Sequence, residues 1–192
     1  LSFLGTGGLT IDEIRDGVCS IKSSIAPNQV FGANLLCNLV KPEYEDQTVD
    51  VLLSEGVNLT EASAYSRITA SLVRYRVLGL KENADGSMHI PHRMFAKLSR
   101  PEVAAQFLSP PTPKLVNQLV ERGVISQEEA RLSERIPMAD DITVEADSGG
   151  HTDRGILGAI LPTIIRMRDE AQEKHLHWPR IHVGAAGGLG TP

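Results

Sequence analysis

The sequence predicts an α/β fold, and more specifically an incomplete (β/α)8 TIM barrel, on two observations. Short apolar runs alternate along the chain with amphipathic helical patterns, which implies a parallel sheet with right-handed crossovers. Nearly every run also ends at its carboxyl side in small or polar residues: 5–8, Asn34, Ser63, Lys97, 145–151 and 184–188. A barrel places functional residues at all of its strand ends, whereas the alternative, a doubly wound sheet, concentrates them at one switch point. The barrel is therefore favoured.

The elements of the first half follow each other in strand–loop–helix units. Residues 1–4 form a strand, and the capping box from Thr10 to Glu13 opens a helix that continues to about Ser24. The runs QVFGANLL and GVNLTEASA predict the second and third strands, each followed by a helix. The stretch KENADGSMHIPHR contains the hairpin signal Asp85-Gly86 and predicts a small β-excursion. His89 and His92 within it are expected on the surface rather than as ligands.

RMFAKLS predicts the fourth strand, and a helical insertion interrupts the alternation after it. Apolar residues recur at helical spacing between 101 and 141, and the segment 126–129 caps a second helix there. The insertion is either a surface elaboration or a lid or carrier-docking element. ITVEADSGG and RIHVGAAGG predict the fifth and sixth strands, with a helix between them. The chain thus divides into barrel residues 1–100, the insertion 101–141 and continued barrel 142–192.

Composition narrows the function classes. The chain has 192 residues, 41% of them hydrophobic, and a net charge of −5 without a Lys/Arg cluster, which argues for a globular protein and against nucleic acid as a partner. No apolar run reaches the roughly 18 residues of a membrane span, and no signal peptide is expected. We therefore expect a cytoplasmic protein without a membrane partner. Cys19 and Cys37 lack metal-ligand spacing, so neither a metal site nor a disulfide is predicted.

The stretch EADSGGHTD, residues 145–153, is the densest group of candidate functional residues. The pair Gly149-Gly150 follows a strand, where glycine allows main-chain N–H groups to face a ligand directly. His151 is the side chain of this stretch that can act as an acid or base near neutral pH. The stretch therefore predicts a ligand-binding loop.

Four motifs in this order resemble one enzyme family: VRYRVLGL, AKLSRPEVAAQFLSP, PMADDITVEADSGGHTD and VGAAGGLGTP. The family comprises the trans-acting, FMN-dependent enoyl reductases of bacterial polyketide and polyunsaturated fatty acid synthases, which are relatives of nitronate monooxygenases. The resemblance implies an FMN-binding TIM barrel. It also implies the reaction: NADPH reduces FMN, and hydride passes to the β-carbon of an enoyl chain carried on an acyl carrier protein. Partners would be that carrier and other synthase components.

The resemblance also implies roles for individual residues. His151 would transfer a proton or orient the substrate carbonyl, or else cap the following helix. Asn34 would bond the flavin edge, with a turn cap as the alternative, and Lys97 would lie beside the flavin ring, with an ordinary surface lysine as the alternative. Of Glu145 and Asp147, one would bond the ribityl hydroxyls and the other would set the tautomer of His151. The expected flavin-binding residues are Asn34, Lys97, Glu145, Asp147, Ser148, Gly149, Gly150, Gly187 and Gly188.

Gly187-Gly188 would hold the FMN phosphate, because phosphate sites of barrels commonly follow strands seven and eight; a tight turn without ligand is the alternative. The family's HTDNRP stands here as HTDRGI, so Arg154 and Gly155 could alter contacts with the substrate. The six strands would correspond to strands two to seven of the barrel. We therefore expect an excerpt of a longer polypeptide. It should form either an open barrel with a gap between its first and last strands, or a barrel whose gap is filled by another chain, with weak or no FMN binding in this form.

Two other functions are consistent with the sequence. A nitronate monooxygenase would share barrel, flavin and histidine but would oxidise a small nitronate with O₂. A non-catalytic carrier-docking module within a synthase is the second alternative, and absence of bound flavin would indicate it.

Overall fold

A six-stranded parallel sheet forms the centre of the computed structural model, which describes residues 2–26, 28–146 and 155–187. The strands lie in the order β1-β2-β3-β6-β7-β8. Their bounds are Ser2–Leu4 for β1, Phe31–Leu36 for β2, Leu59–Ser63 for β3, Arg93–Leu98 for β6, Asp141–Glu145 for β7 and His182–Ala186 for β8. Every neighbouring pair is parallel, as the alternation of strands and helices predicted.

The sheet is open rather than closed into a barrel. β1 and β8 stand at its two edges, and neither pairs with the other in the part of the chain that the structure describes. The expectation of an open sheet with the first and last strands at its edges is confirmed. A closed (β/α)8 barrel is not formed by these residues, because six strands do not close the ring that eight would.

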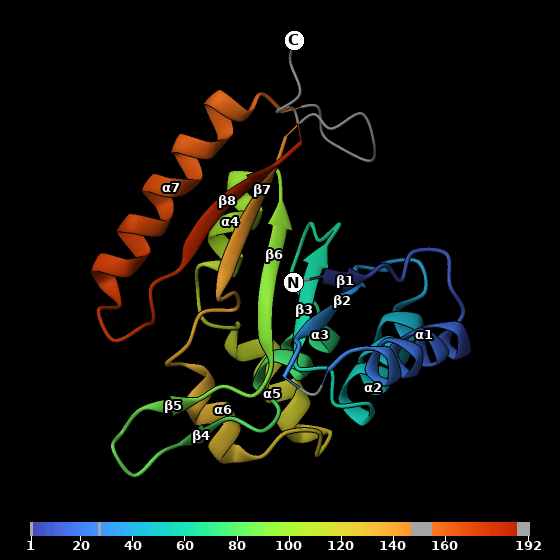
Figure 1. Ribbon diagram of the computed structural model, residues 1–192. Helices are drawn as coiled ribbons and strands as arrows, with labels where there is room; N and C mark the ends of the chain where they lie inside the picture. Colours follow the sequence, from blue (N-terminus) through green and yellow to red (C-terminus); the bar gives the residue numbers. More distant parts are fainter. Residues whose placement is uncertain (1, 27, 147–154, 188–192) are drawn as a thin grey trace.

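Seven helices lie around the outside of the curved sheet in the described part of the chain (Figure 1). They are α1 Ile11–Ser24, α2 Pro42–Ser54, α3 Ala70–Val77, α4 Pro101–Phe107, α5 Pro113–Glu121, α6 Gln127–Ser133 and α7 Leu157–Lys174. The capping boxes predicted from Thr10 and Ser126 are both present, at the starts of α1 and α6. Side-chain oxygens there satisfy helix N–H groups that have no partner within the helix.

Alternate residues of the strands face these helices and form the core. Buried side chains of this kind include Ala33, Leu35, Met94, Ile142 and Val144. The expected insertion contributes to the same core through α4, α5 and α6, since Phe107, Leu119 and Leu132 are buried in it. α5 packs on α3 and α6, and in Figure 1 these helices lie toward the end of the sheet where β6 begins. The roles predicted for the insertion, as a lid, a carrier-docking element or a surface elaboration, stay predictions.

The β-excursion before β6 is a hairpin of β4 (Lys81–Glu82) and β5 (Met88–His89), as Asp85-Gly86 predicted. Gly86 has a φ of 81°, a conformation that glycine adopts without strain. His89 is exposed, as expected, but the surface position predicted for His92 is wrong. Its ring is half-buried and lies 5.0 Å from that of Tyr75, because the chain folds back onto α3 before entering β6.

Candidate functional site

Four polar side chains meet on the inner face of the sheet, the face opposite the helices. They are Asn34 of β2, Glu61 of β3, Lys97 of β6 and Glu145 of β7. Successive residues of a strand point to opposite faces, so each of these side chains is turned away from the core while its neighbours are buried in it. The register places Asn34 opposite Glu61 on adjacent strands. Four neighbouring strands therefore supply one polar cluster.

Asn34 is held by hydrogen bonds across the sheet. Its Nδ2 donates to the Glu61 carboxylate at 3.0 Å, to the Glu61 main-chain oxygen at 3.2 Å and to Ser63 Oγ at 2.9 Å. Thr6 Oγ1 donates to the main-chain oxygen of Asn34 at 2.9 Å. The turn-capping alternative for Asn34 does not hold, because its side chain joins two strands rather than closing a turn.

Lys97 lies between two carboxylates. Its Nζ is 3.9 Å from Glu61 Oε2 and 3.6 Å from Glu145 Oε1. The side chains of all three are about a quarter exposed, at 28%, 23% and 22%. Lys97 is thus a half-buried, paired ammonium rather than an isolated surface lysine. Partial exclusion of water strengthens such charge interactions compared with fully exposed pairs.

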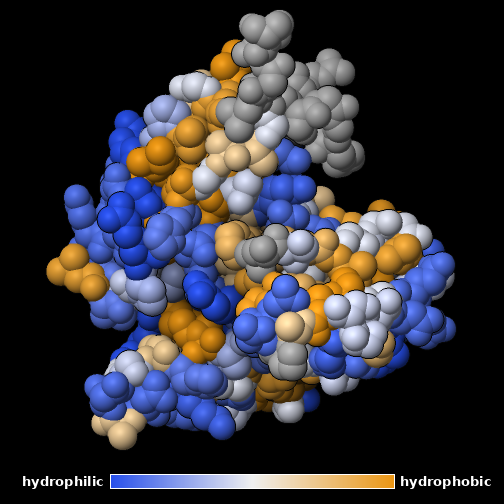
Figure 2. Space-filling model, viewed as in Figure 1, coloured by the Kyte–Doolittle hydropathy of each residue, from blue (hydrophilic) through white to orange (hydrophobic). Residues whose placement is uncertain are grey.

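An aromatic pair lies next to the polar cluster on the same face. The rings of Phe3 in β1 and Phe95 in β6 meet edge to face, with centroids 5.7 Å apart. They approach each other over Gly32 in β2, where an added Cβ would clash with the Phe3 ring. The inner face thus combines apolar surface with polar groups, as ligand sites commonly do. Figure 2 shows a hollow between the α7 part of the surface and the β1–α1 part, bordered by hydrophilic and hydrophobic residues.

The chain turns sharply just after several strands of the sheet. Ala64, directly after β3, has a φ of 61°, which is unusual for a residue with a Cβ. Gly8 in the loop after β1 and Gly187 after β8 have φ values of 80° and 78°. Cys37 N–H donates to the Ser63 main-chain oxygen at 3.2 Å, so the loops after β2 and β3 are tied together. Strained or glycine-bearing turns at strand ends are typical of functional sites.

The structure brings together three of the residues that the sequence predicted for cofactor binding: Asn34, Lys97 and Glu145. Gly187 lies at the end of β8, next to β7, and Ala146 N–H donates to the Ala186 oxygen at 2.9 Å there. The remaining predicted residues lie outside the described part of the chain: Asp147, Ser148, Gly149, Gly150, His151 and Gly188, together with Arg154.

Sequence reasoning missed Glu61, which contacts both Asn34 and Lys97. A signal was available, since the third strand reads Leu-Thr-Glu-Ala-Ser and puts a carboxylate and a hydroxyl two residues apart on one face. The sequence pattern identifies Ser63 only as a polar strand end. No group of three or more His, Cys, Asp or Glu suited to a metal ion occurs among the described residues. Cys19 and Cys37 are both free thiols, in agreement with the prediction of no disulfide.

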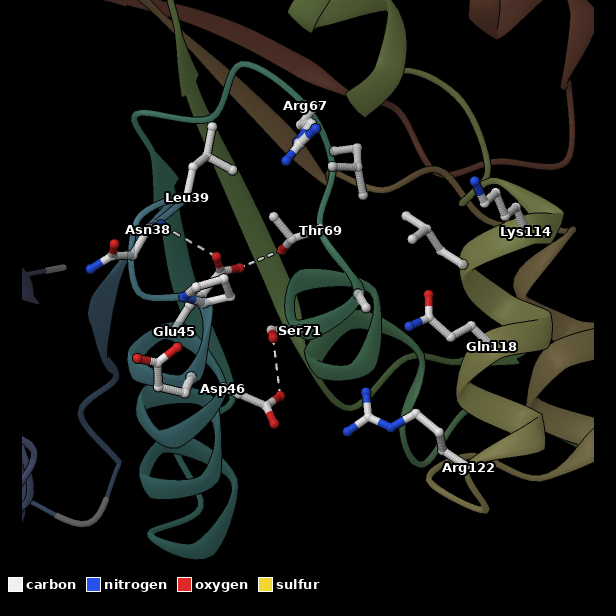
Figure 3. Close-up of a pocket in the computed structure, with 15 residues that line it drawn as sticks. Asn38, Leu39, Glu45, Asp46, Arg67, Thr69, Ser71, Lys114, Gln118 and Arg122 are labelled. Carbon is white, nitrogen blue, oxygen red and sulfur yellow. Dashed lines mark hydrogen bonds between the residues drawn. The ribbon is translucent and has the colours of Figure 1, made fainter.

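A second cavity, of about 490 Å³, lies outside the sheet between α2, α5 and the loop before α3 (Figure 3). The Glu45 carboxylate at its wall is 2% exposed and accepts hydrogen bonds from the hydroxyls of Tyr65 and Thr69. Burial raises the pKa of Glu45 above its usual value, and these hydrogen bonds oppose the shift. Lys114 and Arg122 line the opposite wall on and just after α5. None of the predicted site residues lines this cavity.

The chain is similar in sequence to segments of much longer biosynthetic proteins, although no family model matches it. It is 44% identical over 192 residues to the polyketide biosynthesis protein PksE of Bacillus subtilis, covering all of this chain and 25% of that protein. It is 42% identical over 195 residues to a polyunsaturated fatty acid synthase polypeptide of Thraustochytrium sp., covering all of this chain and 13% of that polypeptide. No helix in the described part of the chain is long and apolar enough to cross a membrane.

Among solved structures, the enoyl reductase domain of MlnA, from the macrolactin biosynthesis cluster of Bacillus amyloliquefaciens, matches with a TM-score of 0.91 and 39% sequence identity. The match covers 99% of this chain and 43% of that domain. The chain thus spans a quarter or less of the curated relatives named above and less than half of the solved domain. It is therefore a homologue of a segment of polyketide and polyunsaturated fatty acid synthase proteins, with the α/β fold of the matching part of an enoyl reductase domain.

Proposed function

We propose that this chain supplies part of the active site of an FMN-dependent enoyl reductase in polyketide or polyunsaturated fatty acid biosynthesis. The reaction is the NADPH-driven reduction of the α,β double bond of an enoyl thioester carried on an acyl carrier protein. The observation that carries the proposal is the inner-face cluster of Asn34, Glu61, Lys97 and Glu145 in a chain whose fold matches an enoyl reductase domain with a TM-score of 0.91.

The chemistry of the inner face fits FMN. Asn34 offers its Oδ1 as an acceptor for a ring N–H, Lys97 offers a positive charge, and Glu145 offers an acceptor for hydroxyl groups. Gly184, on β8, leaves open space on this sheet, since an added Cβ would meet no atom within 4 Å. Apolar surface from Phe3 and Phe95 is available to a flat ring. When bound, FMN would supply the hydride chemistry, which amino-acid side chains do not provide.

Residues of this chain would bind the cofactor, orient it and supply a proton to the substrate. Lys97 would place its ammonium where negative charge develops as electrons arrive, an electrostatic role that is strong in a partly dehydrated site. Asn34 would fix the orientation of the bound ring through its carbonyl oxygen. His151, by the resemblance of its motif to the enoyl reductases, would hold the proton that the substrate α-carbon receives, as a general acid near neutral pH. Gly187 and Gly188 would bind the phosphate through main-chain N–H groups.

A spectrum and an assay of the full-length protein test the proposal. We expect a yellow protein that releases FMN on heat denaturation, identified by chromatography against FMN and FAD standards. NADPH consumption should then depend on a crotonyl thioester, with the carrier-bound thioester turned over faster than the free one.

The outcomes separate the alternative functions. Activity on propionate-3-nitronate with O₂, without activity on the thioester, would indicate a nitronate monooxygenase. A full-length protein without flavin would contradict the proposal and favour a non-catalytic docking role. Release of FAD in place of FMN would contradict the cofactor assignment.

A further inference from the structure

Glu61 contacts both polar side chains that flank it on the inner face. Its Oε2 accepts a hydrogen bond from Asn34 Nδ2 at 3.0 Å and lies 3.9 Å from Lys97 Nζ. It also accepts from Ser63 Oγ at 3.3 Å. Glu61 occupies the strand between β2 and β6, so it is the side chain placed to connect Asn34 with Lys97.

The contacts around Asn34 determine which end of its amide is available. An amide has one acceptor end and one donor end. All three hydrogen bonds of the side chain use Nδ2, and two of them go to oxygens that can only accept: the Glu61 carboxylate and the Glu61 main-chain oxygen. The reversed amide would place Oδ1 against those oxygens and lose these bonds. Asn34 therefore presents Oδ1, an acceptor, to whatever binds beside it.

The charges around Lys97 depend on Glu61 as well. Two carboxylates, Glu61 and Glu145, face one ammonium at 3.9 and 3.6 Å. Replacing either carboxylate by a neutral amide leaves the positive charge of Lys97 less compensated. A ligand that gains electrons beside Lys97 would then be reduced more easily, because the local potential becomes more positive.

We propose that Glu61 is a positioning residue of this site: it sets the orientation of the Asn34 amide and moderates the charge of Lys97. The proposal rests on the proposed function for its consequences at the flavin. The first role, orienting the Asn34 amide, concerns only residues of this chain, so it can be tested without the flavin.

Three variants of the full-length protein separate the two roles. Glu61→Gln keeps an oxygen that can accept from Asn34 but removes the charge. Glu61→Ala removes both. Glu145→Gln removes a carboxylate beside Lys97 without a contact to Asn34, and is the matched control for the charge. Each variant is measured by NMR of the Asn34 side-chain amide after selective 15N-asparagine labelling, by FMN titration and by the midpoint potential of the bound flavin.

We expect the Asn34 amide signals to keep their positions in Glu145→Gln and to stay close to them in Glu61→Gln. They should shift clearly in Glu61→Ala, where the bond to the carboxylate is lost while those to the main-chain oxygen of residue 61 and to Ser63 Oγ remain. The midpoint potential should rise in both glutamine variants. The dissociation constant of FMN should increase about two- to tenfold in Glu61→Ala, the effect of losing one neutral hydrogen bond from Asn34 Oδ1 to the ring.

Asn34 signals that are unchanged in Glu61→Ala would overturn the first role. A midpoint potential unchanged in Glu61→Gln while it rises in Glu145→Gln would overturn the second. Equal losses of thermal stability in both Glu61 variants, without movement of the Asn34 signals, would make Glu61 only a structural link between strands. A wild-type protein without flavin would contradict the proposed function, and the NMR measurement would still decide the role of Glu61 toward Asn34.

Discussion

Replacing Arg76 with methionine removes a guanidinium group from the interior of the fold. Arg76, on α3, is fully buried and pairs with Asp140 through two hydrogen bonds of 2.6 and 3.1 Å. It also donates to the main-chain oxygens of His92 and Pro137, at 2.9 and 3.1 Å. Asp140 in turn accepts from Met94 N–H at 2.7 Å. The pair therefore ties α3 to the segments that enter β6 and β7.

The expected loss of stability follows from what the substitution leaves behind. Methionine has a similar length and no charge, so the Asp140 carboxylate, whose side chain is 11% exposed, would lose its buried partner and keep only the weaker contact with the exposed Arg93, 4.0 Å away. Removing one member of a buried ion pair costs about 3–5 kcal/mol, mostly because the remaining charge is left without compensation. That is a large part of the roughly 5–15 kcal/mol that stabilises a typical domain.

The control is Arg74→Met, two residues earlier on the same helix. Arg74 pairs with Asp46 and Asp50 at 3.3 and 2.7 Å, but these partners are 37% and 59% exposed. Water can solvate both carboxylates after the substitution, so the expected cost is about 1 kcal/mol or less. The loss of stability in Arg76→Lys should lie between those of the two methionine variants. Lysine keeps the positive charge, but its ammonium cannot make the two parallel hydrogen bonds.

Urea unfolding of the full-length protein, followed by circular dichroism, would give the free energy of unfolding of each variant. The values can be compared directly if the m-value is unchanged. If Arg76→Met costs no more than Arg74→Met, the buried pair does not hold β6 and β7 as described. A change in the m-value would show that the substitution alters the unfolded state or the cooperativity, and the comparison would then be made by thermal unfolding.

Three further outcomes are expected. Lys97→Gln should raise the FMN dissociation constant about tenfold or more in a fluorescence titration, since it removes a charged contact; an unchanged constant would contradict the role of Lys97, and Lys81→Gln on the β4–β5 hairpin is the control. His151→Ala should retain FMN but slow acyl reduction by about 10²-fold or more in a stopped-flow assay; loss of flavin with an unchanged chemical step would make His151 structural. Burial raises the pKa of Glu45, so its contribution to stability is present below its usual pKa and is lost as the pH rises through the raised value. Glu45→Gln should abolish that part of the pH dependence of Tm, and a pH profile equal to that of wild type would contradict it.

Secondary structure could be predicted from short stretches of sequence because its determinants are local. The capping boxes of α1 and α6 need only two side chains three residues apart. The hairpin turn at Asp85-Gly86 likewise depends on adjacent residues. The strand positions followed from apolar runs bounded by small residues. Three members of the candidate site, Asn34, Lys97 and Glu145, were found because they lie within or at the end of such strands.

The contacts of the site could not be predicted in this way. Glu61 lies 27 residues from Asn34 along the chain, and only the pairing of β2 with β3 places them opposite each other. The surface position expected of His92 was wrong because burial against Tyr75 depends on how the hairpin returns to α3. The buried pair of Arg76 and Asp140 spans 64 residues and carries no local signal.

The sequence by itself therefore determined the α/β class, the order of strands and helices and the positions of several polar residues at strand ends, because periodicity and capping act over a few residues. Tertiary structure alone decided the register of β2 against β3 and of β3 against β6, across the intervening helix and hairpin. It thereby decided that Glu61 stands between Asn34 and Lys97. Contacts between strands depend on the register of distant segments, which is set by the packing of the whole sheet against its helices.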